Sequence, residues 1–197
     1  LRSIVTVDEE KGVQAGMLGF SELYKRADSV PFEVYRALTE SLSSDEVINM
    51  QYTSGTTGFP KGVMLTHKNI LNNGRFIGDN MKLSEKDRLC ITVPLFHCFG
   101  MVLAMMACIS HGTSMVPVEY FQTVKTMSAI SEQKCTAVHG VPTMFIAMLG
   151  HPDFDKYDFS HLRTGIMAGS PCPIKTMQEV IDRMGMREIT IVYGQTE

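Results

Sequence analysis

The sequence has no excess of basic residues and no basic run interleaved with aromatic residues. Lysine and arginine together number 18, against 21 aspartate and glutamate residues. A protein whose main partner is a nucleic acid or an anionic membrane needs a concentrated positive surface. We therefore expect neither as the main partner here, and any polyanion that binds must be held by a local group of residues.

Long apolar runs are absent as well. The longest uncharged one, residues 101–109, has about half of the ~20 residues that a membrane-spanning helix needs, so it predicts a buried helix and no transmembrane segment. The five cysteines are odd in number and scattered, with no basic-then-apolar leader before them. Their gaps to the neighbouring histidines match no common zinc pattern. We expect packed, reduced thiols and a cytoplasmic protein.

Short apolar runs alternate with helical periods from residue 88 onward. Strands are predicted at residues 89–93, 113–118, 136–139, 164–168 and 188–193, and helices at residues 101–109, 124–130, 144–149 and 174–184. Strand, helix and strand at this spacing predict an α/β fold with a mostly parallel sheet and flanking helices. The length of 197 residues indicates one domain or a large piece of one.

The part before residue 88 is read in two pieces. Residues 47–52 and 63–65 have extended patterns, and Thr66 can cap a following helix whose apolar stripe is Ile70, Ile77 and Met81. Residues 1–46 are less regular, with a strand-like SIVTV and helix-like FSELYKRA and PFEVYRAL. We therefore separate a leading segment, residues 1–46, from a core of residues 47–197.

The segment YTSGTTGFPKG, residues 52–62, has the composition of an anion-binding loop. It holds three glycines, four small hydroxyl residues and one lysine in eleven positions. It is not a Walker loop, because no Gly-Lys-Ser/Thr leads into a helix. Donors to phosphate would be the backbone N–H groups of Gly55 and Gly58, the Lys61 ammonium and four hydroxyls. Those hydroxyls belong to Thr53, Ser54, Thr56 and Thr57. A flexible surface loop without a ligand is the alternative.

Polar or glycine-rich loops follow four of the predicted strands. They are PLFHCFG (94–100), GVPT (140–143), GSPCP (169–173) and YGQTE (193–197). Ligands of open parallel sheets bind outside the carboxyl ends of the strands, where such loops gather. We therefore expect the site at this edge, with Lys61 and Glu197 converging on one nucleotide.

YTSGTTGFPKG, GSPCP and YGQTE resemble the signatures of adenylate-forming (AMP-binding) enzymes, and the wider wording is similar to medium- and long-chain fatty acyl-CoA synthetases. The resemblance implies ATP, Mg²⁺, a fatty acid and CoA as reactants or cofactors. It also implies a role for each matching residue. Tyr193 would stack on adenine with Gly194 beside it, Thr196 would contact the α-phosphate, and Glu197 would hold Mg²⁺. Gly169, Ser170 and Pro171 would line the adenine and acyl side, and His97 would meet the carboxylate and later the thiol.

The resemblance covers about residues 45–197, and such enzymes are much longer. The ribose-binding aspartate, the hinge and the small C-terminal domain expected after YGQTE are not in the sequence. We therefore expect a central fragment of the large domain, with little or no turnover alone. Two alternatives stay open: an adenylation domain that loads an amino or aryl acid onto a carrier protein, and a nucleotide-binding module without catalysis.

Overall fold

A computed structural model describes residues 3–54 and 58–197. The chain divides into two compact units, Leu1–Ser44 and Asp45–Glu197. Among the residues described, none of the helices combines the length and the apolar character needed to cross a membrane.

The first unit contains two short strands and two helices. Strands β1 (Val5–Thr6) and β2 (Leu18–Gly19) pair in parallel, and helices α1 (Phe20–Ala27) and α2 (Phe32–Ser41) follow. Both predicted helices are therefore confirmed. Neither helix has a buried residue within the described chain, and the large apolar side chains of both are exposed.

The second unit is built on a five-stranded parallel sheet with the order β6-β5-β7-β8-β9. These strands are β5 (Arg88–Ile91), β6 (Ser114–Pro117), β7 (Ala137–Gly140), β8 (Thr164–Ala168) and β9 (Glu188–Val192). Strands β7 and β8 are completely buried, as expected for a parallel sheet covered on both faces. The predicted α/β class is confirmed.

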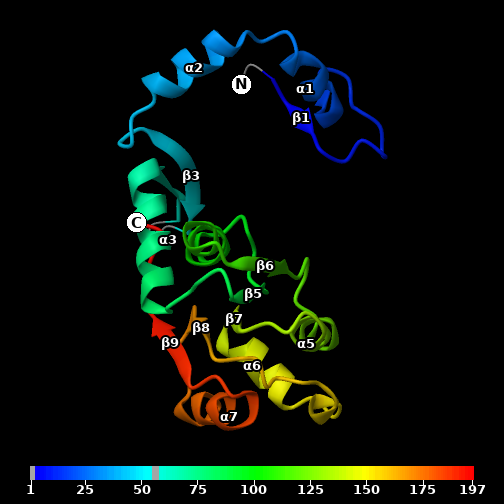
Figure 1. The fold of residues 1–197 in the computed structure, drawn as a ribbon, viewed down its shortest axis with the longest axis vertical. Coiled ribbons are helices and arrows are strands. Elements are labelled where there is room, and N and C mark those ends of the chain that lie inside the picture. Colours follow the sequence, from blue (N-terminus) through cyan, green and yellow to red (C-terminus); the bar gives the residue numbers. More distant parts are fainter. Residues whose placement is uncertain (1–2, 55–57) are drawn as a thin grey trace. The chain divides into compact units, whose positions relative to one another are not determined.

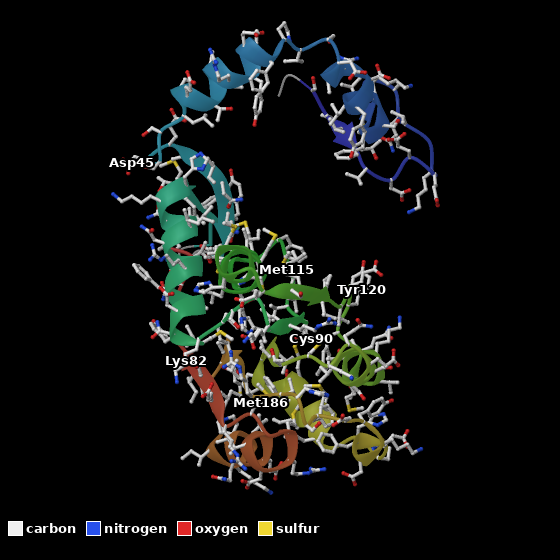
Figure 2. The ribbon with its side chains drawn as sticks, viewed as in Figure 1. Asp45, Lys82, Cys90, Met115, Tyr120 and Met186 are labelled. Carbon is white, nitrogen blue, oxygen red and sulfur yellow. The ribbon has the colours of Figure 1, made fainter. Side chains whose placement is uncertain are left out.

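Successive side chains of each strand enter two different hydrophobic clusters. Cys90, Val138 and Met167 pack with helices α5 (Thr123–Glu132), α6 (Pro142–Leu149) and α7 (Ile174–Met184). The alternating residues Leu89, Ala137 and Ile166 pack on the other face, towards α3 (His67–Asn80). Figure 1 shows α5, α6 and α7 on one side of the strands and α3 on the other. The result is three layers, and Figure 2 shows Cys90 and Met186 in the interior of the unit.

The apolar run predicted as one helix forms two helices of different kinds. A π-helix, η1, spans Phe99–Met106, and α4 spans Ala107–His111. Ile109, expected to be buried, is 57% exposed. Gly100 fits close to the preceding loop, since a Cβ there would lie 2.2 Å from the carbonyl oxygen of Pro94. Long π-helices are rare and frequently occur at functional sites.

The glycine-rich segment joins two antiparallel strands, as predicted. Strand β3 (Val47–Thr53) pairs with β4 (Lys61–Thr66), and the pair forms a sheet of its own. Thr66 then caps α3: the Asn69 amide donates to the Thr66 hydroxyl, and the Thr66 amide donates to the Asn69 side chain, both at 3.1 Å. This reciprocal capping box fixes where the helix begins. A short 3₁₀ helix, η2, spans Phe154–Lys156.

Candidate active site

The loops that follow β5, β8 and β9 enclose a cavity of about 200 Å³ at the carboxyl edge of the sheet. Its remaining walls come from α3 and η1, and most of the surface is apolar, with Leu65, Phe99 and Leu103 among the contributors. His97, Gly169 and Thr196 also line it. We call this space the first cavity. The GVPT loop does not line it.

A second cavity, of about 580 Å³, lies along strand β3. All six residues from Asn49 to Ser54 line it, together with Leu95, Phe96 and Met101. His97 and Thr196 line both cavities. The two spaces therefore meet at one histidine and one hydroxyl group. The first is mostly apolar, and the second has both polar and apolar walls.

Lys61 and Glu197 form an ion pair across 136 residues of sequence. Lys61 is the first residue of β4 and lies opposite Thr53 in the hairpin register. Glu197 follows β9 at the sheet edge. The hydrogen bond from the Lys61 ammonium lowers the pKa of Glu197, so the carboxylate is ionised at neutral pH. Lys61 and Glu197 therefore lie together, as expected, and their convergence on one nucleotide stays a prediction.

His97 is held by the start of η1. The backbone amide of Phe99 donates to Nδ1 of His97 at 3.1 Å. The neutral imidazole therefore carries its hydrogen on Nε2. The Cys98 thiol bridges the same region, with Sγ 3.7 Å from Nδ1 of His97 and 3.7 Å from the hydroxyl of Thr196.

The structure places the predicted site residues differently. Those that line a cavity are Thr53, Ser54, His97, Gly169, Tyr193, Gly194 and Thr196. Five of the predicted residues line neither cavity and are exposed: Gly58, Lys61, Ser170, Pro171 and Glu197. Gly58 has a left-handed backbone, with φ of +92°, that glycine adopts readily. Gly55, Thr56 and Thr57 lie outside the described residues.

Helix α3 contributes a wall of the first cavity that was not predicted from the sequence. Asn69, Asn73 and Ile77 line the first cavity. They lie four residues apart, so they form one stripe along the helix. The neighbouring stripe, Ile70 with Gly74 and Gly78, is buried. A helix face with two glycines can pack closely against a neighbouring element, and these glycines were the available signal in the sequence. The close packing of this face places the adjacent asparagine stripe at the wall of the cavity.

Comparison with known proteins identifies the family. The model of the AMP-binding enzyme family matches residues 1–197. The chain belongs to the AMP-binding enzymes.

Individual relatives and solved structures agree with this family. YngI of Bacillus subtilis (strain 168), named as an acyl-CoA synthetase, is 64% identical over 157 residues, which are 80% of this chain and 29% of YngI. The mitochondrial medium-chain acyl-CoA ligase ACSF2 of Danio rerio is 40% identical over 100% of this chain and 32% of its own length. The chain thus spans about a third of the length of the relatives it matches.

A solved structure of the anthranilate CoA ligase AuaEII in complex with anthranoyl-AMP superposes with a TM-score of 0.71 at 28% identity. The match covers 78% of this chain and 30% of AuaEII. Together with the family match, this likeness places the fold among the adenylate-forming enzymes.

The donor set around Glu197 can be compared with the needs of Mg²⁺, the ion that the sequence resemblance implies. In the described part of the chain, no group of three or more histidine, cysteine, aspartate or glutamate side chains could hold a metal ion. Mg²⁺ is commonly bound through one or two carboxylates with substrate phosphates as further ligands. A single ionised carboxylate beside the predicted nucleotide site therefore fits this ion.

Proposed function

We propose that the complete protein is an AMP-forming acyl-CoA synthetase, which joins a fatty acid to CoA through an acyl-adenylate. One observation carries the proposal. The apolar first cavity opens at His97 and Thr196, within the same sheet edge as the Lys61–Glu197 ion pair. A hydrophobic acid and a charged nucleotide can thus meet there, and the names of YngI and ACSF2 support this chemistry.

In the first step, a carboxylate oxygen of the acid attacks the α-phosphorus of ATP, and the bond to pyrophosphate breaks. Negative charge grows on the leaving pyrophosphate, so fixed positive charge and hydrogen-bond donors lower the barrier. The Lys61 ammonium and the hydroxyls of Thr53 and Ser54 supply these donors, and Thr196 contacts the α-phosphate. Glu197 would hold Mg²⁺, which when bound neutralises phosphate charge.

In the second step, the thiol of CoA releases its proton to water and its sulfur attacks the acyl carbonyl carbon, and AMP leaves with the electrons of the broken C–O bond. His97 lies where the two cavities meet. Since its Nδ1 accepts from the Phe99 amide, Nε2–H is the group left to donate to the acyl oxygen. The first cavity takes the hydrocarbon chain, and a medium-chain acid is the proposed substrate class. The cytoplasmic location remains a prediction from the sequence.

The proposal is tested with the complete protein and a panel of acids. ATP–pyrophosphate exchange and acyl-CoA formation are measured with octanoate, palmitate, benzoate and free amino acids, with CoA or a carrier-protein domain as acceptor. We expect exchange and CoA ester formation with octanoate. Exchange only with aryl or amino acids, followed by transfer to the carrier protein, would contradict the proposal. ATP binding without exchange would indicate a non-catalytic module.

Variants of the ion pair add a test of the site itself. Lys61→Ala and Glu197→Gln are expected to lower the exchange rate by about a hundredfold or more, because each removes charge that acts on the reacting phosphates. Lys175→Ala and Glu179→Gln are matched controls, since these residues form another exposed lysine–glutamate pair, 3.8 Å apart, on helix α7. Equal rates in the two pairs of variants would exclude the proposed role.

A further inference from the structure

His139 is a completely buried polar side chain behind the wall of the first cavity. It lies in strand β7, on the same face as Ala137, and has no solvent exposure. Its backbone carbonyl accepts a hydrogen bond from the hydroxyl of Thr92 at 2.5 Å. His139 lines neither of the two cavities, so it does not contact a substrate in them.

The imidazole of His139 contacts two residues of η1 that do line the first cavity. Its ring stacks on Phe99, with centroids 5.7 Å apart and planes inclined by 30°. Its Nε2 lies 3.0 Å from the carbonyl oxygen of Leu103. Phe99 in turn donates its backbone amide to His97. One buried ring therefore contacts two wall residues, and one of them positions the histidine between the cavities.

The protonation state of His139 suits this contact. Burial lowers the pKa of His139 to about 4, so the ring is neutral near pH 7. A carbonyl can only accept, so Nε2 carries the hydrogen and donates to Leu103. Nδ1 has no hydrogen-bond partner in the described part of the protein. An apolar side chain would avoid that unsatisfied nitrogen, as Ala137 and Ile166 do on the same sheet face.

The backbone contacted is a π-helix. A π-helix is rare and usually only a single turn long. Contacts from outside the helix are therefore needed for η1 to keep this conformation over eight residues. On one side of η1, Gly100 leaves room for the loop that contains Pro94, because it has no side chain. His139 contacts the helix from strand β7, through the Leu103 carbonyl.

We propose that His139 is a positioning residue for the acyl site, which keeps η1 in the conformation that shapes the first cavity and orients His97. The inference rests on the proposed function, because it takes the first cavity as the place of the acyl chain. The residue acts through Phe99 and Leu103 and takes no part in bond making.

Three variants of the complete enzyme separate the two contacts of the ring. His139→Phe keeps an aromatic ring and loses the donor, His139→Gln keeps a donor and loses the ring, and His139→Leu loses both. Each contact is expected to contribute about threefold to tenfold to the KM for octanoate, so His139→Leu should raise it by about tenfold or more. The KM for ATP should change less than about twofold, since none of the contacts reaches Lys61 or Glu197.

Phe145→Leu is the control, because Phe145 is equally buried but belongs to the cluster on the opposite face of the sheet. It should lower stability without changing the KM for octanoate. A purely structural role of His139 would give all four variants the same pattern, and that result would overturn the inference.

Hydrogen exchange of peptides covering residues 99–106 gives a readout that does not need turnover. Exchange should accelerate in His139→Leu and stay near the wild-type rate in Phe145→Leu. Unchanged exchange in His139→Leu refutes the positioning role even if the enzyme is active. If the wild-type protein forms no CoA ester with any acid, the proposed function fails, while the exchange result still decides the role of His139. Should His139→Leu not fold, the Gln and Phe variants decide in the same way.

Discussion

Replacing Arg163 with methionine removes the centre of a polar network at the amino edge of the sheet, opposite the candidate site. The guanidinium binds the Asp87 carboxylate with two hydrogen bonds, of 3.1 and 2.9 Å, and Glu188 with one of 2.8 Å. It also donates to the carbonyl oxygens of Met81 and Lys82. Figure 2 shows Lys82 at the end of α3. One side chain thus joins the segment after α3 to strands β5, β8 and β9.

The expected cost follows from the burial of Asp87. Its side chain is only 6% exposed and keeps hydrogen bonds from Thr136 and Ser84 when Arg163 is removed. Leaving a buried charge without its partner costs about 3–5 kcal/mol of the free energy of unfolding. Lys82→Met is the matched control. It loses only a 3.9 Å contact between side chains that are 78% and 49% exposed, which is worth about 0–1 kcal/mol.

A double-mutant cycle shows whether the cost comes from the stranded carboxylate. Asp87→Asn and Arg163→Met are combined, and unfolding of the complete protein is followed in urea, with hydrogen exchange in β5 and β8 as a local measure. The free energy of unfolding that the double variant loses should be smaller than the sum of the losses in the two single variants, by about 0.5–3 kcal/mol. If Arg163→Met is no less stable than Lys82→Met, or if the losses simply add, the reasoning is wrong.

The pH dependence has a defined sign. Burial by itself opposes ionisation of Asp87, but the hydrogen bonds from Arg163 and Thr136 outweigh it and lower the pKa below the ordinary 3.8. The ionised carboxylate therefore contributes stability above pH 3.8 that is lost as the pH falls through the folded-state pKa. The stability difference between wild type and Asp87→Asn should shrink in that acid range and stay constant above it.

Three further predictions concern the interior and the cavity wall. The pKa of His139 is lowered from 6.5 to about 4, so as the pH falls this histidine is protonated first in the unfolded state. Acid should therefore remove up to about 3 kcal/mol of the free energy of unfolding between pH 6.5 and 4. In His139→Phe, the free energy of unfolding measured in urea should lack this dependence on pH. Gly100→Ala should destabilise the protein by more than about 1 kcal/mol, because its Cβ would overlap the Pro94 carbonyl oxygen, and a wild-type urea midpoint would contradict this. Asn73→Leu removes an amide from the first cavity and should raise kcat/KM for octanoate relative to a hydroxy-substituted acid by about threefold to tenfold, whereas an unchanged ratio would exclude Asn73 from substrate selection.

Much of the fold could be predicted from local patterns. The alternation of apolar runs with helical periods placed the five sheet strands and the helices between them. It could do so because the spacing of apolar side chains along a strand or helix indicates which of its faces is buried. Thr66 marked the start of α3 in the same local way. The convergence of three of the four polar loops on the first cavity was also predictable, since the carboxyl ends of parallel strands meet at one edge.

The sequence by itself therefore determined the α/β class, the strands and helices, and the family signatures in its loops. Only the tertiary structure decided the strand order, the contact between Lys61 and Glu197, the asparagine stripe of α3 at the first cavity, and the π-helix that His139 supports. The physical reason is one of range. Periodicity indicates which face of a helix or strand is buried. The strand order and these contacts depend instead on which elements, distant in the sequence, pack against that face.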